Sequence, residues 1–381
     1  MKLNKQMLDY IDAHVEQIKQ IIRDLCAIPA PSHHEEKRAE YCRAWFARSG
    51  FEGAYIDEAL NVVCPYHVTQ DNDLVVFMAH TDTVFPDLTP MPFREDEKKM
   101  YAPGVCDDTA NLAVMMICAK YFVENGLAPK CGVLFVANSC EEGLGNLKGS
   151  RQIVKDFGAR LRAFHTFDGT TLNRVVTNAV GSHRYRLTVR TEGGHSYGAF
   201  GNRNAIYYLS SIIQTIYTMK VPQKAGTKTT YNVGTITGGT SVNTIAQEAS
   251  MLCEYRSDDR ECLAIMQNFF EKTFEAHRAM GVEVDVELVG DRPCSGPVDP
   301  EAYAALIARV DAAIRENLGQ EAVHTSSSTD ANIPLAAGIP AVCTSAAVGR
   351  GCHTREEEID LDQLPNGARL TMGIIGDYFK T

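Results

Sequence analysis

The sequence predicts an α/β fold in which a mixed sheet, covered by helices on both faces, is interrupted by an inserted α+β domain with an antiparallel sheet. Two apolar runs, LVVFMA at residues 74–79 and GVLFVAN at residues 132–138, stand on either side of a helical stretch at residues 111–125. This order is a β-α-β pattern. Strands without polar interruption are typical of a sheet that is covered on both faces.

The pattern of the chain changes near residue 178. GSHRYRLTVRTEGG, at residues 181–194, alternates apolar and polar residues as a half-exposed strand does. Helix, two strands, helix and strand follow, which together describe a compact α+β module with one exposed sheet face. After Pro293 the pattern returns to a helix, a short apolar strand and a final helix. We therefore expect residues 178–291 to be a domain inserted between residues 1–177 and residues 292–381 of an outer domain.

Composition and charge argue against several classes of function. A chain of 381 residues exceeds the size at which one core usually stops growing, so two domains are expected. The net charge of −11 argues against a nucleic-acid surface, which carries a basic stripe. The N-terminal segment has no signal-peptide core, and the longest apolar run is too short to span a membrane. The twelve cysteines are dispersed without a CxxC pair, which favours free thiols in a reducing cytoplasm.

Acidic and histidine residues stand at the ends of the predicted strands of the outer domain. Ligands of open α/β sheets gather outside the carboxyl ends of the strands, so these positions are expected to converge on one crevice. The residues are His80, Asp82, Asp107, Asp108, Glu141, Glu142, Asp168 and His353.

These residue types suit a pair of metal ions. Imidazole nitrogen and carboxylate oxygen bind zinc well, and two ions can activate one water while polarising a carbonyl. Each signal alone has a simpler reading, because acidic pairs also start helices and a histidine at a strand end is often only hydrogen-bonded. Their joint occurrence, each at the end of a different strand, favours the metal site.

The motifs HTDTV, GVCDDTANLA, SCEEGLGN, FDG, GGHS and CHTREEE occur in this order along the chain. The set resembles the co-catalytic zinc aminoacylase/carboxypeptidase family of metallopeptidases, which includes peptidase T, glutamate carboxypeptidase and acetylornithine deacetylase. The resemblance covers nearly the whole chain. It implies that the outer domain is a zinc-peptidase catalytic domain and that the inserted domain serves as a lid or in dimerisation.

The resemblance also implies a set of metal ligands. By it, His80 and Asp168 bind one ion, Glu142 and His353 bind the other, and Asp107 bridges the two. The cofactors are then two divalent ions, with zinc expected and cobalt or manganese as alternatives.

Three acidic residues beside these ligands receive other roles. The resemblance implies that Glu141 is the general base that takes a proton from the attacking water. It implies that Asp82 hydrogen-bonds the free nitrogen of His80, which fixes the tautomer of the ring. Asp108 occupies a position that varies in the family, so we interpret it as capping or structural.

The inserted domain contributes candidates for substrate contact. By the resemblance, His195 stabilises the developing oxyanion, often in the site of a neighbouring subunit, and Asn243 contacts substrate. Arg256 matches an arginine that grips a substrate carboxylate, a task that suits its bidentate fork. The simpler readings are a plain turn for GGHS and a surface charge for Arg256. Ala246 stands where the family usually has proline, which weakens inferences about the shape of this loop.

The sequence departs from the family after the bridging aspartate. The family commonly has lysine and glycine there, whereas this chain has Thr109–Asn111, which removes a charge near the metals. Three cysteines adjoin candidate ligands and could themselves be soft ligands. They are Cys106, Cys140 and Cys352. The complete carboxylate and histidine set disfavours that alternative.

The function implied is hydrolysis of an amide bond in a small peptide by a water that two metals activate, as in a di- or tripeptidase similar to peptidase T. The first alternative is an N-acyl amino acid deacylase with the same machinery. The second is a non-catalytic zinc-binding relative, which the presence of Glu141 and of all the ligands disfavours. The partner is a small peptide or an N-acyl amino acid. Relatives are homodimers or monomers, so a homodimer through the inserted domain is one of two expectations.

Overall fold

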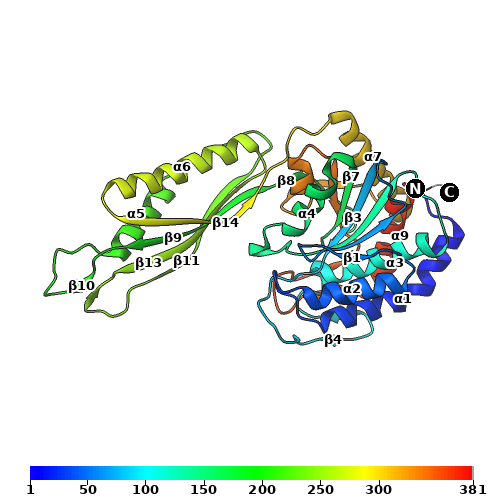
Figure 1. Cartoon of the computed structure of the whole chain (residues 1–381), viewed down its shortest axis with the longest axis horizontal. Coiled ribbons are helices and arrows are strands. Elements are labelled where there is room, and N and C mark those ends of the chain that lie inside the picture. Colours follow the sequence, from blue (N-terminus) through cyan, green and yellow to red (C-terminus); the bar gives the residue numbers. More distant parts are fainter. Residues whose placement is uncertain (380–381) are drawn as a thin grey trace. The chain divides into compact units, whose positions relative to one another are not determined.

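The computed structural model describes residues 1–379, and its chain divides into two compact units. The first unit consists of Met1–Ala179 and Gly296–Thr381, and the second consists of Val180–Ser295. Each unit has its own sheet and its own helices (Figure 1). The predicted α/β fold class, with a large mixed sheet and an antiparallel sheet, is confirmed.

The first unit is built on an eight-stranded mixed sheet. Neighbours β3–β6, β3–β7, β7–β16 and β8–β15 are parallel, and the remaining neighbours are antiparallel. In spatial order the strands are β1 (Tyr55–Ile56), β2 (Val62–Tyr66), β6 (Gly132–Asn138), β3 (Leu74–His80), β7 (Leu161–Phe167), β16 (Ala341–Thr344), β8 (Arg174–Ala179) and β15 (Val323–Ser327).

Helices cover both faces of this sheet, because alternate residues of β3 enter two different cores. Val75 and Phe77 pack in the core that contains α1, α2, α3, α7 and α9, whereas Val76 and Met78 pack in the core that contains α4 and α8. The helices are α1 (Lys5–Cys26), α2 (Glu36–Arg48), α3 (Asn111–Glu124), α4 (Lys148–Phe157), α7 (Pro300–Leu318), α8 (Asn332–Ala336) and α9 (Leu364–Gly376). Short helical turns are η1 (Val105–Ala110), η2 (Gly143–Gly145), η3 (Gly158–Arg160) and η4 (Leu361–Gln363).

A small antiparallel sheet brings two distant segments of the first unit together. Its order is β17-β18-β5-β4, and it pairs Tyr101 with Glu358. The segment just before Asp107 therefore lies beside the segment just after His353. The strands are β4 (Arg94–Glu95), β5 (Lys99–Tyr101), β17 (Gly349–Arg350) and β18 (Glu358–Asp360).

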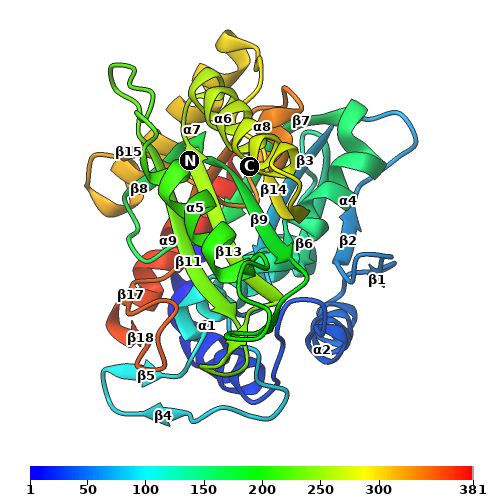
Figure 2. The ribbon, with the colours of Figure 1, turned by 90° about the vertical axis from the view of Figure 1, so that its left-hand side faces the viewer.

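The second unit is an antiparallel sheet with two helices on one face. The sheet has the order β11-β13-β9-β14, and Figure 2 shows its strands side by side. Along β13, Met251, Cys253 and Tyr255 are buried under α5 and α6, and alternate residues are more exposed. The elements are β9 (Gly181–Arg190), β11 (Thr229–Gly238), β13 (Glu248–Ser257), β14 (Glu283–Arg292), α5 (Ala205–Tyr217), α6 (Arg260–Ala279) and the short pair β10 (Gly194–His195) and β12 (Thr244–Ile245).

None of the helices within residues 1–379 has both the length and the apolar character needed to cross a bilayer.

Candidate metal centre

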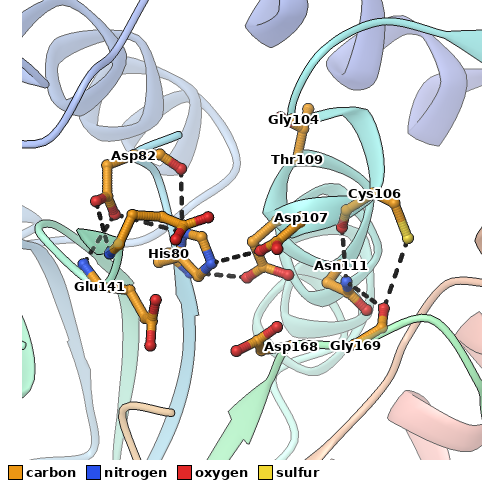
Figure 3. Close-up of polar contacts among 12 residues, drawn as sticks. His80, Asp82, Gly104, Cys106, Asp107, Thr109, Asn111, Glu141, Asp168 and Gly169 are labelled. Carbon is orange, nitrogen blue, oxygen red and sulfur yellow. Dashed lines mark hydrogen bonds and ion pairs between the residues drawn. The ribbon is translucent and has the colours of Figure 1, made fainter. Parts of the chain in front are cut away.

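Three neighbouring strands of the first unit carry acidic and histidine side chains at their carboxyl ends. His80 ends β3, Asp168 follows β7 directly, and Glu141 and Glu142 lie shortly after β6. Because β3 is parallel to both β6 and β7, these ends meet at one edge of the sheet. Figure 3 shows His80, Glu141 and Asp168 at this edge, around the side chain of Asp107.

Asp107 lies between two imidazole rings. It belongs to the irregular turn η1 before α3, and its peptide bond to Asp108 is cis. Its Oδ1 lies 3.1 Å from Nε2 of His80, and its Oδ2 lies 3.2 Å from Nε2 of His353. The two oxygens of one carboxylate therefore face two different histidines.

Three groups of side chains within residues 1–379 have the geometry to hold a metal ion. In each group the potential ligand atoms lie within 4.8 Å of one another. The groups are His80, Asp107 and Asp168; Asp107, Glu142 and His353; and His80, Glu141 and Glu142. The first two groups share Asp107, so a single carboxylate joins two sets of donors. In the second group, Oε1 of Glu142 lies 3.2 Å from Nε2 of His353.

Asp82 contacts two parts of this cluster at once. Its backbone carbonyl oxygen lies 3.1 Å from Nδ1 of His80, and its Oδ1 lies 3.3 Å from the same nitrogen, on the side of the ring opposite Asp107. The same carboxylate accepts the backbone N–H groups of Glu141 and Glu142, each at 2.9 Å, and the hydroxyl of Ser32 at 2.7 Å. The resemblance implied only the contact with the ring of His80. Asp82 therefore contacts the ring of His80 and also fixes the backbone that carries the two glutamates.

In the second unit, the structure brings His195 and Asn243 together. His195 pairs with Thr244 across β10 and β12, and the N–H of Ser196 donates to the carbonyl oxygen of Asn243 at 2.9 Å. Nδ1 of His195 accepts the N–H of Tyr197 at 3.2 Å. A ring nitrogen that accepts carries no proton, so the neutral ring bears its proton on Nε2, which remains a donor.

Arg256 lies elsewhere in the second unit, near the end of β13. Its guanidinium makes two bonds to Glu254, at 2.8 Å from Nε and 2.9 Å from Nη2. Residues two apart on a strand share a face, which explains this pairing. The fork that was expected to face a substrate carboxylate therefore faces a carboxylate of the chain itself.

Residues 76–377 match the model of a protein family described as Peptidase family M20/M25/M40. The match covers well over half of the chain. The chain belongs to this family. The predicted resemblance to co-catalytic metallopeptidases is thereby confirmed.

The M20 chain is also similar to individual proteins. It is 23% identical to carboxypeptidase G2 of Pseudomonas sp. (strain RS-16) over 312 residues, which cover 80% of this chain and 73% of that protein. The solved structure of a tripeptidase from Staphylococcus aureus has a TM-score of 0.75 and 23% identity, and the alignment covers 96% of this chain and 98% of that one. A dinuclear metal-binding peptidase of the M20 family from Bacillus subtilis has a TM-score of 0.64 and 16% identity, with coverages of 96% and 98%. The two structures show that the fold is shared.

The donor set of this M20 site fits divalent metal ions. Imidazole nitrogen and carboxylate oxygen are ligands that zinc prefers. Burial, with the negative charge of Asp107, raises the pKa of Asp168 well above its usual range, and burial raises the pKa of Glu142 to about 7. Oε1 of Glu142 is buried and accepts no hydrogen bond, although the ring nitrogen of His353 lies within ion-pair distance. Carboxylates packed this closely need a nearby cation to stay ionised.

Two further M20 residues beside the cluster have contacts that the sequence did not indicate. Asp108 accepts the backbone N–H of His80 at 2.8 Å and does not cap α3, so of the two roles expected for it only the structural one fits. Asn111 donates to the carbonyl oxygens of Cys106 at 2.9 Å and Gly169 at 3.1 Å. Asn111 therefore ties the turn that carries Asp107 to the segment after β7.

Two of the three cysteines beside the candidate ligands have other partners. The thiol of Cys140 donates to Oε1 of Glu35 at 3.2 Å, and the thiol of Cys106 donates to the carbonyl oxygen of Gly169 at 3.6 Å. Burial raises the pKa of the Cys140 thiol, which keeps it protonated. None of the three candidate ligand groups found within residues 1–379 contains a cysteine. The alternative of soft cysteine ligands gains no support.

Proposed function

We propose that the chain hydrolyses an amide bond of a small peptide, as a di- or tripeptidase, at a site that holds two divalent metal ions. The observation that carries this proposal is the position of Asp107, whose two oxygens face His80 at 3.1 Å and His353 at 3.2 Å. A carboxylate shared by two sets of donors is what a pair of ions a few ångströms apart requires.

The proposed ligands of one ion are His80 and Asp168, and those of the other are Glu142 and His353, with Asp107 shared. This division follows two of the three groups of ligand atoms. When bound, two such ions polarise the carbonyl of the scissile bond and lower the pKa of a water toward neutrality. We propose zinc, with cobalt or manganese as alternatives, because the donors are nitrogen and oxygen.

The chain's own residues then move the proton and orient the groups. We propose that Glu141 takes the proton of the attacking water and passes it to the leaving amine. Support comes from its burial, with 5% of its surface exposed, and from its place in a group with His80 and Glu142. Asp82 holds the backbone of Glu141 in place through the bond of 2.9 Å. A base fixed in this way loses little freedom when the substrate arrives.

The second unit is proposed to handle the substrate. His195 would donate from Nε2 to the oxygen that becomes negative during attack, since its Nδ1 already accepts a backbone N–H. Asn243, held beside it, is proposed to contact the peptide. Arg256 is a candidate for a substrate carboxylate, and a substrate that binds there has to displace Glu254 from the guanidinium.

A hydrolysis panel tests this proposal. The protein is freed of metal, reloaded with zinc, cobalt or manganese, and assayed with dipeptides, tripeptides and N-acetyl amino acids. We expect cleavage of unmodified di- or tripeptides that depends on the added metal. Cleavage of N-acetyl amino acids alone would overturn the peptidase proposal in favour of a deacylase, and the absence of metal-dependent hydrolysis would overturn both.

We also propose that the chain works in the cytoplasm as a homodimer joined through the second unit. All twelve cysteines are free thiols, which suits a reducing compartment. Strand β11 lies at the edge of its sheet and leaves the side chain of Ile236 55% exposed. The unpaired backbone groups of an edge strand can pair with a second copy. Light scattering during gel filtration measures the mass in solution, and a monomer at micromolar concentration contradicts the dimer.

A further inference from the structure

A buried glutamate binds the turn that carries Asp107. Glu357, just before β18, has no exposed surface. Its Oε1 accepts the backbone N–H groups of Cys106 and Asp107, and its Oε2 accepts the N–H of Gly104, all at 2.8 Å. One carboxylate therefore satisfies three donors within four consecutive residues of the chain.

These donors need an acceptor because they stand at the start of η1, where N–H groups have no helical partner. Asp107 has φ −104° and ψ 86°, and Asp108 has φ −126° and ψ 16°, so the ladder of helical hydrogen bonds is broken here. The turn also packs closely at Gly104, whose φ is +75°, because a Cβ at this position would lie 2.5 Å from Cγ2 of Thr83. Buried N–H groups without an acceptor destabilise a conformation strongly. Glu357 supplies the acceptor.

The same residue belongs to the segment that carries His353. It follows His353 by four residues, and its own carbonyl oxygen accepts the N–H of Ala102 at 3.1 Å. Main chain and side chain of Glu357 thus both bond the strand and turn that lead to Asp107. Oδ2 of Asp107 and Nε2 of His353 lie 3.2 Å apart at the end of this connection.

We propose that Glu357 is a positioning residue that fixes Asp107 relative to His353 and thereby sets the affinity of the site for its metal pair. The inference rests on the proposed function, because it assumes that Asp107 is shared between two ions. Mutation of a residue that hydrogen-bonds a metal ligand and orients it changes metal affinity or activity by about 10- to 100-fold. A glutamate that merely stabilises the fold would change the melting temperature and leave metal affinity unchanged.

The variant Glu357→Gln isolates this role. The carboxamide has nearly the shape of the carboxylate, but one of its ends is a donor. If its oxygen takes the place of Oε1, its NH2 group faces the N–H of Gly104 as donor against donor. Glu356→Gln is the matched control, because Glu356 is the adjacent residue, is exposed and undergoes the same chemical change.

Zinc binding to the metal-free proteins is measured by competition with a chromophoric chelator of known affinity, and kcat and KM are measured beside it. We expect the wild type and Glu356→Gln to bind two zinc ions with equal affinity. We expect Glu357→Gln to bind at least one ion about 10- to 100-fold more weakly. Its kcat should fall with little change in KM, and excess zinc should restore part of the activity.

The outcomes separate the two ideas. If the wild type binds fewer than two zinc ions, the proposed function is wrong. If the wild type binds two and Glu357→Gln binds them equally well, the positioning role is wrong, even if the melting temperature falls. Should Glu357→Gln fail to fold, Glu357→Asp replaces it, since the charge is kept and only the reach is shortened. The same criteria apply, with a smaller expected loss of affinity.

Discussion

The polar groups of the first unit and those of the second are held in different ways. His80 and Asp82 have 1% and 0% of their surface exposed. Ion pairs or hydrogen bonds hold the ring of His80 and the carboxylate of Asp82. In the second unit His195 is exposed, and Tyr197 and Phe200 beside it are each 91% exposed. Buried and fully bonded groups keep one geometry before any ligand arrives, whereas an exposed loop can adapt.

The difference indicates a division of tasks. The proposed metal binding and proton transfer tolerate errors of only a fraction of an ångström, which suits the rigid edge of the large sheet. Contact with substrates of varied shape is compatible with a loop on a smaller sheet. Changes in the first unit should therefore affect metal affinity and chemistry, and changes in the second should spare metal affinity.

The largest effect is expected from Glu141→Gln. The amide keeps the size of the side chain but cannot accept the proton, so turnover should fall by about 10²- to 10⁴-fold. Metal content, measured by mass spectrometry on the same sample, should remain at the wild-type level. Turnover close to that of the wild type would remove Glu141 from the mechanism, and loss of metal would make it a ligand instead.

A smaller effect is expected from His195→Ala. Removal of a donor to a developing oxyanion costs about 10²- to 10³-fold in kcat, and zinc affinity should not change because the residue lies outside the ligand groups. Tyr197→Ala is the control, since it removes an exposed side chain from the same loop and leaves the ring of His195 intact. Weaker zinc binding by His195→Ala would contradict the inferred division of tasks between the units.

Asp82→Asn should have an effect smaller again. The asparagine places an NH2 group against one of the backbone N–H groups of Glu141 and Glu142, which lie 2.9 Å from the present carboxylate oxygens. Zinc affinity and kcat should each fall by about 10- to 100-fold. Asp71→Asn is the control, because it makes the same chemical change on an exposed loop. If both variants behave alike, Asp82 does not support the cluster.

Sequence patterns predicted the sheet of the first unit because its signals are local. The run LVVFMA is buried along its whole length in β3, and the positions of His80 and Asp168 at strand ends predicted that they converge at one edge of the sheet. Sequence patterns did not indicate a role for Glu357, because it stands in the charged run REEE, which is typical of a solvated surface. Its burial depends on the pairing of β18 with β5, more than 250 residues earlier in the chain. Such a contact leaves no local pattern.

The bond between Arg256 and Glu254 is a different case. The two residues stand two apart on a strand, so they share a face and the pairing could have been predicted. The contacts of Asn111 could not have been predicted, because its amide joins three segments that only the folded sheet brings together. Local periodicity therefore predicts elements and strand ends, whereas the bonds between loops at the edge of the sheet require the structure.

The smallest expected effect concerns the acid stability of the first unit. His165 of β7 is buried against Phe77, and its Nε2 lies 2.9 Å from the hydroxyl of Tyr378. Burial lowers the pKa of His165 to about 3, from its ordinary value near 6.5. Between these values the unfolded chain binds a proton that the folded chain does not. Stability should therefore fall as the pH falls through 6.5, by about 1.4 kcal/mol per pH unit from this residue.

His165→Phe removes the titrating group and keeps an aromatic ring beside Phe77. Its free energy of unfolding in urea, measured between pH 5 and 7, should be lower at pH 7 because the hydroxyl of Tyr378 loses its partner. The free energy of unfolding should change less steeply with pH than that of the wild type, by up to about 1.4 kcal/mol per pH unit, which corresponds to one proton. The other groups contribute equally to both proteins. Equal slopes would show that His165 is protonated in the folded state, and the rigidity inferred for the first unit would then not extend to β7.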